Sequence, residues 1–307
     1  MLSTFLTTMN KAKPFIKWAG GKTQLIKKLG NYFPDFEGTY YEPFIGGGAV
    51  FFHLKPEKAV LGDANEELIN LFKIIKKKPK ELMERLNQHQ SKVQNKEYYL
   101  DIRSWDIQKL DDIETAARTI FLNKTCFNGL YRVNSKGQFN VPFGRTSQGK
   151  PPKLYSKENI EACSKALKNV VLRCEDFYEI VKKTGPGDFV YLDPPYHAPN
   201  KASMYSKLAY SDELQDRVAQ FYHDLAKTGA KVMLNNSATL EILKDSHESI
   251  KELYENKSYH SKVLDSKWSI GAIGEWRGKR GELMVLNYEP KDSFDLQEQQ
   301  TLLDSSK

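Results

Sequence analysis

The chain of 307 residues has only three cysteines, and it lacks the features of a membrane or secreted protein. Cys126, Cys163 and Cys174 are widely spaced, and no Cys/His cluster has the spacing of a zinc site. The six histidines form no metal-binding spacing either. We therefore expect free thiols in a reducing cytosol, without a disulfide framework and without a metal centre.

Long apolar segments are scarce as well. No apolar run approaches the roughly 18 residues that a membrane-spanning helix needs, and the mean hydropathy is −0.59. Residues 1–10 lack the basic and apolar regions of a secretory signal. A GxxxxGK[ST] phosphate-binding loop is missing, which argues against ATP hydrolysis. These absences predict a cytoplasmic protein without a membrane partner.

The chain does contain a modest excess of positive charge. It has 46 Lys and Arg against 39 Asp and Glu, a formal net charge of +7. Hydrophobic residues make up 40% and aromatic residues 12%, which is enough for a real core. The length allows one large domain, or a core domain with a companion of roughly 100 residues. A net charge of this size favours an acidic partner only weakly.

The positive charge is concentrated in one segment, residues 118–153. No Asp or Glu occurs in these 36 residues, where the chain average of 39 in 307 predicts four or five. Aromatic residues and asparagines are interspersed through the segment. Its basic residues are Arg118, Lys124, Arg132, Lys136, Arg145, Lys150 and Lys153. Such a mixture is typical of a nucleic-acid surface, although a solvated basic loop has the same composition.

Strand and helix patterns alternate on both sides of this segment. Strands are expected at 40–44, 59–61, 170–173, 189–192, 231–235 and 282–288, and helices at 49–53, 66–76, 80–94, 112–123 and 213–228. This alternation predicts an α/β fold with a parallel sheet and helices on both of its faces. The polar helical block 77–168 interrupts the alternation like an insertion. The tail, 291–307, is expected to be flexible.

A glycine-rich turn follows the first expected strand, in the motif Glu42-Pro-Phe44-Ile-Gly46-Gly47-Gly48. Glycines at a strand-to-helix turn let the backbone approach a nucleotide-like ligand. Asp63 follows the second expected strand, 17 residues after Gly46, where a carboxylate can accept ribose hydroxyls. Together these residues predict an adenosine-type cofactor pocket, although structural turns share the pattern.

A second motif, Asp193-Pro194-Pro195-Tyr196, comes directly after the expected strand 189–192. Two prolines end a strand abruptly because they cannot donate to the ladder. Asp193 and Tyr196 are therefore expected at the carboxyl edge of the sheet, where open α/β sheets bind ligands. The carboxylate and the Pro194 carbonyl can accept hydrogen bonds from an exocyclic amine, and Tyr196 offers a face for a base taken out of a duplex. A strand-end turn without chemistry is the alternative.

A third motif, PFIKWAGGK, lies near the N-terminus at 14–22. Trp18 can cover an apolar ligand face, and Lys22 can meet a carboxylate. On their own, the two residues are more typical of a core tryptophan and a surface lysine.

Taken in order, four segments resemble the DNA adenine-N6 methyltransferase (Dam) family, class α. They are PFIKWAGGK (14–22), EPFIGGGAVFF (42–52), NGLYRVNSKGQFNVPFGR (128–145) and DPPY (193–196). The resemblance spans about residues 12–290. It implies a Rossmann-like, S-adenosylmethionine-dependent methyltransferase sheet with an inserted, mainly helical target-recognition domain. The catalytic domain is then discontinuous, at 11–75 and 169–290, and the recognition domain lies at 76–168.

The resemblance also implies the chemistry and the residues that carry it. S-adenosylmethionine is the methyl donor, with S-adenosylhomocysteine as product, and N6 of adenine in double-stranded DNA is the acceptor, within GATC. The catalytic positions fall on Asp193, Pro194, Pro195 and Tyr196. The cofactor positions fall on Trp18, Lys22, Glu42, Phe44, Gly46, Gly47, Gly48, Asp63, Asp176, Phe177 and Asp193. The DNA-contacting positions fall on Lys17, Phe127, Asn128, Arg132, Pro142 and Arg145.

One segment departs from the family. After DPPY, many members carry a Ser-rich aromatic loop that ends in a Phe-Thr-x-Tyr pattern. This chain has the segment 197–210 instead, with Tyr205 and Tyr210 as candidates for the missing aromatic residue. As partners, the resemblance suggests double-stranded DNA and a cognate restriction endonuclease that acts on the same site. We expect a monomer that associates with the nucleoid through DNA.

Two other classes of function stay open. A methyltransferase with another acceptor, such as N4 of cytosine, RNA or a protein amide, often has Ser or Asn at the position of Asp193. It would not need the whole segment 128–145. A DNA-binding regulator without catalysis would need neither Asp193 nor the cofactor motif.

Overall fold

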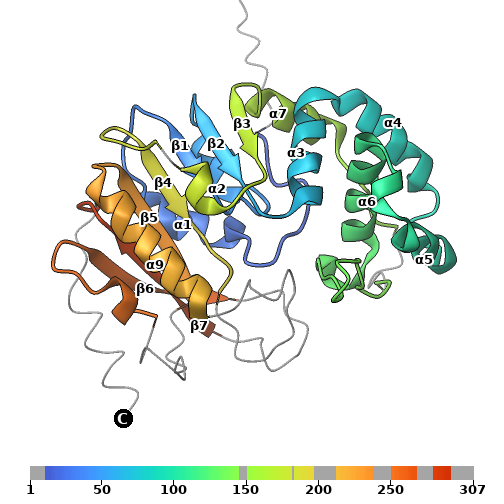
Figure 1. Cartoon of the computed structure of the whole chain (residues 1–307). Coiled ribbons are helices and arrows are strands. Elements are labelled where there is room, and N and C mark those ends of the chain that lie inside the picture. The colour runs from blue at the N-terminus through green and yellow to red at the C-terminus, as the bar shows by residue number, and fades with distance from the viewer. Residues whose placement is uncertain are drawn as a thin grey trace, which may run out of the picture.

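The computed structural model describes residues 11–144, 151–181, 183–196, 212–237, 250–267 and 279–291. Within them, seven strands form one sheet in the order β3-β2-β1-β4-β5-β7-β6 (Figure 1). The strands are β1 (Tyr40–Glu42), β2 (Ala59–Gly62), β3 (Val170–Arg173), β4 (Phe189–Leu192), β5 (Lys231–Ser237), β6 (His260–Lys267) and β7 (Lys279–Leu286). The fold is therefore of the α/β class that the sequence predicts.

Five of the strands are parallel, as the alternation predicts. β1 pairs with β2 and β4, β2 pairs with β3, and β4 pairs with β5. The direction expected for the last strand was wrong, because β7 runs antiparallel to both β5 and β6. Only 11 residues, 268–278, separate β6 from β7. A parallel crossover needs a dozen or more residues, so the short connection forces the two strands to run in opposite directions.

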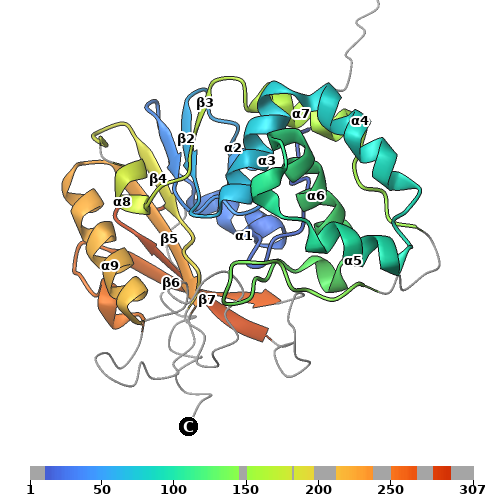
Figure 2. The same cartoon turned by 45° about the vertical axis from the view of Figure 1, so that its right-hand side comes forward.

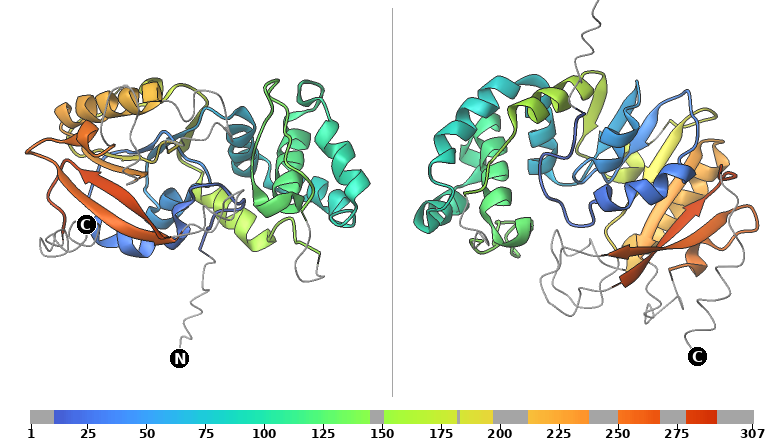
Figure 3. Two further views of the ribbon diagram at one scale, coloured as in Figure 1. Left: turned by 90° about the horizontal axis from the view of Figure 1, so that it is seen from below. Right: turned by 180° about the vertical axis from the view of Figure 1, so that it is seen from behind.

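Helices cover both faces of the sheet (Figure 3). Alternate residues of a strand point to opposite faces, so Tyr40 and Tyr41 belong to two different hydrophobic clusters. The first face is covered by α1 (Ile26–Leu29), α2 (Ala49–Leu54) and α3 (Glu66–Lys77), and the second by α8 (Phe177–Ile180) and α9 (Asp212–Lys227).

A block of helices packs beside the sheet (Figure 2). It contains α4 (Pro79–Gln90), α5 (Lys96–Ser104), α6 (Asp112–Thr125) and α7 (Lys157–Ala166). The helix α3 contacts α4, α6 and α7 as well as the sheet. Buried residues of the block, such as Phe121, therefore belong to the same cluster as Tyr191 of the sheet. The separation of 76–168 as a domain of its own stays a prediction.

The helix ends follow local capping rules. The Asn65 side chain accepts a hydrogen bond from Leu68 N at the start of α3, and the Asp111 side chain caps α6 in the same way. α4 begins with Pro79 and ends at Gln90, four residues before the predicted end. The sequence did not predict α5, α7 or β6. The 3-10 helices are η1 (Lys22–Gln24), η2 (Gly30–Tyr32), η3 (Ile107–Lys109), η4 (Phe127–Gly129) and η5 (Glu252–Tyr254).

Candidate active site

The carboxyl edge of the sheet brings together residues that are far apart in the sequence. β4 ends at Leu192, and Asp193 follows it at this edge. β7 enters the sheet at the same edge because it is antiparallel, and its Glu282 lies opposite Ser237, the last residue of β5. The edge therefore carries one carboxylate after a parallel strand and a second one on the antiparallel strand.

Lys22 joins these two carboxylates. Its side chain is 3% exposed, and Nζ lies 2.7 Å from Asp193 Oδ1 and 3.8 Å from Glu282 Oε2. Nζ also donates to the carbonyl oxygen of Gly20 at 2.9 Å. A buried ammonium is stable here because carboxylate and carbonyl oxygens replace its water. The structure thus brings two residues singled out in the sequence, Lys22 and Asp193, into direct contact.

Tyr196 lies against the same cluster. Its hydroxyl donates to Glu282 Oε2 at 3.3 Å, and Lys22 Nζ lies 4.9 Å from the centroid of its ring. A cation over an aromatic face is attracted by the ring quadrupole. The hydroxyl and the ring of Tyr196 therefore each contact a charged group.

The backbone of the DPPY motif is anchored by two buried amides. Gln215 of α9 donates from Nε2 to the Pro195 carbonyl oxygen at 2.9 Å. Its Oε1 accepts from Asn236 Nδ2 at 2.8 Å. Both amides are fully buried, so this chain of hydrogen bonds couples the motif to β5 and α9.

The Asp193 side chain is 17% exposed, and its pKa lies below neutral pH. Burial raises its pKa to about 6, the charge of Lys22 lowers the pKa, and the charge of Glu282 raises it. The carboxylate therefore acts as a hydrogen-bond acceptor above pH 6.

The glycine turn and Asp63 contact each other. Gly46 N donates to Asp63 Oδ2 at 3.2 Å, and Asn65 N donates to Asp63 Oδ1 at 3.0 Å. Gly46 has φ +47°, and a Cβ on it would lie 2.8 Å from Trp18 Cδ1, so a larger residue does not fit. Burial raises the pKa of Asp63 to about 6, and backbone donors lower it. Trp18, Gly46 and Asp63, which the sequence predicts to surround a nucleoside, thus lie next to one another at the carboxyl edge of the sheet.

Glu42 is almost fully buried. The Tyr40 hydroxyl donates to Glu42 Oε2 at 2.8 Å. Burial raises the pKa of Glu42 to about 8, so the carboxyl group is mostly protonated at neutral pH. Glu42 is 2% exposed and is bound by protein groups, and the charges of Asp193 and Lys22 act on it.

An aromatic pair lies at the other end of the candidate cofactor site. The rings of Phe44 and Phe177 lie 5.2 Å apart. The carboxylate of Asp176 accepts from Arg217 Nη2 at 2.8 Å, and the Arg217 guanidinium carbon lies 4.9 Å from the Phe177 ring centroid. Arg217 of α9 is therefore a further group at this position, which the sequence analysis missed.

Most of the predicted DNA-contacting residues lie on one looped segment, residues 126–144. Two isolated antiparallel β-bridges, Cys126 with Phe143 and Val133 with Phe139, pair the two sides of this segment. Phe127 N donates to the Pro142 carbonyl oxygen at 2.9 Å, and Phe127 is 40% exposed. Asn128 is exposed as well and has φ +56°.

Hydrogen bonds hold the side chain of Arg132 within this segment, and Asn123 connects Lys17 to the segment. Arg132 Nε donates to Asn140 Oδ1 at 2.7 Å. Asn123 hydrogen-bonds both Lys17 and Gly129. Figures 1 and 2 show the segment at the same end of the molecule as the carboxyl ends of the strands. Arg145 lies outside the described residues, as does the segment 197–210.

Arg118 corrects the interpretation of the basic segment 118–153. It is 1% exposed, and Nη1 lies 3.0 Å from Glu67 Oε2. Its Nε and Nη2 donate to the carbonyl oxygens of Ile102 and Arg103, each at 3.0 Å. Arg118 is therefore a structural cation that contributes no surface for nucleic acid.

Sequence reasoning also missed Glu282, Gln215 and Asn236. A signal existed for two of them, since Glu282 is the one charged residue in the otherwise apolar run 282–286 and Asn236 closely follows the apolar run 232–234. Polar residues at strand ends mark an edge, but the pairing of Glu282 with Lys22 depends on the antiparallel direction of β7.

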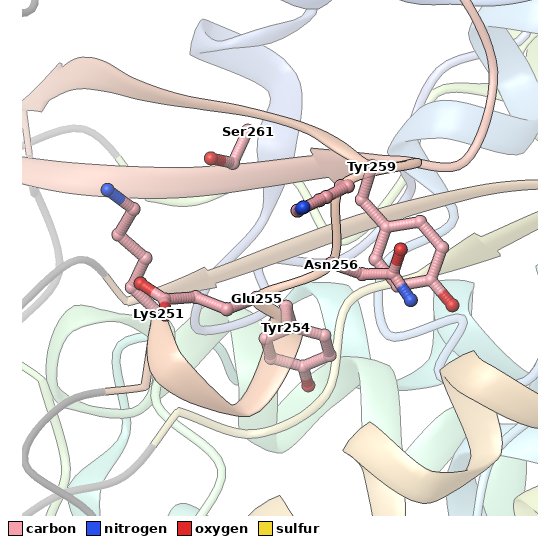
Figure 4. A pocket seen from close by; sticks show the side chains of 7 residues that line it. Lys251, Tyr254, Glu255, Asn256, Tyr259 and Ser261 are labelled. Atoms are coloured by element: carbon pink, nitrogen blue, oxygen red, sulfur yellow. The ribbon is translucent and has the colours of Figure 1, made fainter.

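A shallow pocket of about 400 Å³ lies between η5 and β6 (Figure 4). It is lined by Lys251, Tyr254, Glu255, Asn256, Lys257, Tyr259 and Ser261, none of which the sequence analysis singled out. In the part of the chain that the structure describes, no group of three or more His, Cys, Asp and Glu residues could hold a metal ion. No helix in that part is long and apolar enough to cross a membrane.

The geometry defines an α/β protein with a carboxylate held by a buried lysine, beside a glycine turn bound to a second carboxylate, at the carboxyl edge of the sheet. Comparison with known proteins then gives the family. Residues 18–267 match the family model of the D12 class N6 adenine-specific DNA methyltransferases. The chain belongs to this family and is an adenine-specific DNA methyltransferase.

Similar proteins come from bacteria and archaea. The chain is 42% identical over 285 residues to the type II methyltransferase M1.LlaDCHI of Lactococcus lactis subsp. cremoris, covering 90% of this chain and 95% of the relative. It is 39% identical over 302 residues to the type II methyltransferase M.MjaIII of Methanocaldococcus jannaschii, covering 91% and 100%. It is 31% identical over 287 residues to the DNA adenine methylase of Escherichia coli K12, covering 92% and 97%.

Proposed function

We propose that this enzyme transfers a methyl group from S-adenosylmethionine to N6 of adenine in double-stranded DNA, within GATC, after flipping the base out of the helix. The observation that carries the proposal is the contact of Lys22 with Asp193 beside Tyr196 at the carboxyl edge. The carboxylate can accept a hydrogen bond from the exocyclic amino group of a base, and the aromatic ring can stack on that base.

The residues at the glycine turn fit the proposed cofactor. Gly46 leaves the space beside Trp18 free of a side chain, where a Cβ would collide with the indole. Asp63 accepts from the backbone of Gly46, Ala64 and Asn65, and its remaining lone-pair capacity suits a ribose hydroxyl. Within the part of the chain that the structure describes, Nδ2 and Oδ1 of the buried Asn235, near the end of β5, have no hydrogen-bond partner. When bound, S-adenosylmethionine would supply an electrophilic methyl group on a sulfonium.

Three groups of this chain would act on the adenine. The Asp193 carboxylate and the Pro194 carbonyl oxygen would accept the two N6 hydrogens, which turns the nitrogen lone pair out of conjugation with the ring. Tyr196 would stack on the base. Lys22 Nζ and the Tyr196 hydroxyl both contact the Asp193 carboxylate, and its remaining lone pairs would accept the amine. Positioning and electrostatics then supply most of the acceleration.

The segment 126–144, together with Lys17, would bind the duplex. Phe127 and Asn128 are exposed there, and Asn140 fixes the planar guanidinium group of Arg132. Arginine in this form suits the O6 and N7 acceptors of guanine. The GATC site rests on the resemblance of 128–145 to family members that methylate this sequence. Two similar proteins are named type II methyltransferases, and for this chain a restriction endonuclease that acts on the same site would be the partner.

Transfer of a radiolabelled methyl group tests the proposal. The purified enzyme is given S-adenosylmethionine labelled in the methyl group and duplexes that contain GATC or its single-base variants, and the nucleosides are then separated. We expect label on N6-methyladenine from GATC duplexes alone. Label on cytosine, or equal label on every variant duplex, contradicts the acceptor or the site, respectively.

A further inference from the structure

Glu282 contacts both groups that flank Asp193, although the proposed chemistry does not use it. Its side chain is 8% exposed, and Oε2 lies 3.8 Å from Lys22 Nζ. The same oxygen accepts the Tyr196 hydroxyl at 3.3 Å. Glu282 lies on β7 and pairs in register with Ser237, so its backbone is part of the sheet.

A second carboxylate at this place does not favour stability. Glu282 and Asp193 share the single ammonium of Lys22, which leaves the buried cluster with an excess negative charge. Burying such a charge is costly. Glu282 also raises the pKa of Asp193, which opposes the ionised form that accepts hydrogen bonds. Its presence is better explained by the donors that it holds.

We propose, on the basis of the function proposed above, that Glu282 is a positioning residue for methyl transfer. It binds the Tyr196 hydroxyl and takes one contact of the Lys22 ammonium. The Tyr196 hydroxyl reaches Asp193 as well, so without Glu282 it would bind Asp193 alone. Because Glu282 shares the Tyr196 hydroxyl and the Lys22 ammonium with Asp193, more of the lone pairs of Asp193 stay available to the adenine amine, and the ring that stacks on the base is fixed.

The charges around Asp193 provide a readout that a purely structural role would not change. The titratable groups that face Asp193 are Lys22 from η1, Glu282 from β7, Glu42 and Tyr40 from β1, Tyr191 from β4 and Tyr196 after it. Burial keeps Glu42 mostly protonated at neutral pH, and it keeps the tyrosines neutral. Glu282 is therefore the main negative neighbour of Asp193. Glu282→Gln should lower the pKa of Asp193 and move the acid limb of the rate profile to lower pH.

Single-turnover methyl transfer, measured between about pH 5 and pH 8 with saturating S-adenosylmethionine and GATC duplex, tests the role. We expect Glu282→Ala to slow transfer roughly 10- to 100-fold, because it misplaces the reacting groups. Glu282→Gln keeps an oxygen for Tyr196 and should recover part of this loss. Affinity for DNA should stay within about threefold of wild type, since no DNA contact is removed. The matched control is Glu289→Gln, a carboxylate 86% exposed three residues after β7, which should match wild type throughout.

The double variant Glu282→Gln/Tyr196→Phe shows whether the two residues act as a unit. If they do, the double variant is no slower than the slower single variant. A Glu282→Ala enzyme that equals wild type at every pH, or whose loss equals its unfolded fraction by circular dichroism, overturns the positioning role. All rates are ratios to wild type on whichever base it methylates. Methylation of cytosine by wild type would therefore contradict the proposed function and still test Glu282.

Discussion

Asn123 binds Lys17 by two hydrogen bonds, although the two residues lie 106 positions apart in the sequence. Its Oδ1 accepts from Lys17 N at 3.0 Å, and its Nδ2 donates to the Lys17 carbonyl oxygen at 2.8 Å. The same Nδ2 donates to the Gly129 carbonyl oxygen at 3.1 Å. One buried amide thus sets the position of the looped segment 126–144 relative to the N-terminal motif that carries Lys22.

Replacing Asn123 with alanine should separate these segments. The variant leaves three buried or partly buried backbone groups without this partner, so we expect the free energy of unfolding to fall by roughly 1–3 kcal/mol. Affinity for the GATC duplex should fall as well, while affinity for S-adenosylmethionine should stay near the wild-type value. Urea unfolding and equilibrium binding measure these effects. Asn87→Ala, at an exposed position of α4, serves as the control, and an equal loss in both variants would contradict the prediction.

Asp193→Ala should abolish methyl transfer, because the acceptor of the adenine amine is lost. DNA binding should be largely retained, since Asp193 lies at the sheet edge and not on the segment 126–144. Label transfer and a gel-shift titration on the same preparation check both statements. Robust labelling by the Asp193→Ala variant would show that another group performs its role.

The rate of transfer should depend on pH through Asp193. Its pKa, raised by burial to about 6, means that the carboxylate is available above pH 6 and is protonated below it. We expect a constant single-turnover rate above this value and a tenfold decrease per unit below it. Asp63 has a pKa of about 6 as well, so cofactor affinity must be measured over the same range. A rate that does not change between about pH 5 and pH 8 would contradict the role of Asp193.

Glu42 should make the folded protein less stable as the pH rises. Burial raises its pKa from 4.5 to about 8, so the folded protein keeps a proton that the unfolded chain releases. Stability is therefore lost between pH 4.5 and pH 8, by at most about 1.4 kcal/mol per unit. Glu42→Gln removes this titration. The free energy of unfolding of the variant, relative to that of wild type, should therefore increase as the pH rises. Urea unfolding at several pH values tests this, with the exposed Glu57→Gln as control. A gain that is the same at every pH would refute it.

Arg132→Ala should weaken sequence discrimination more than affinity for DNA in general. A guanidinium that reads a guanine contributes roughly 1–3 kcal/mol of discrimination at one base pair. Binding to GATC and to its single-base variants should therefore become more alike at that position. An equal loss on all duplexes assigns Arg132 to a phosphate. Lys136→Ala, an exposed cation of the same segment, is the comparison expected to show such a uniform loss.

Local patterns of the sequence predicted much of the fold. The two prolines after Leu192 end β4 where the turn chemistry indicates, and the Asn65 cap begins α3 within the predicted limits. β6 escaped prediction because its sequence, HSKVLDSK, has little apolar alternation and its place depends on pairing with β7. α5 and α7 are short and polar, so their periodicity is weak.

The sequence by itself determined the α/β class, the motifs and their positions at the ends of strands, because turn chemistry and periodicity act over a few residues. Only the tertiary structure decided that Arg118 is buried against Glu67 and that Glu282 joins Lys22 and Tyr196. In both cases the partners come from elements that are distant in the chain. Whether a charged side chain is buried depends on which carboxylate or cation the packing brings to it, and no local sequence pattern contains that information.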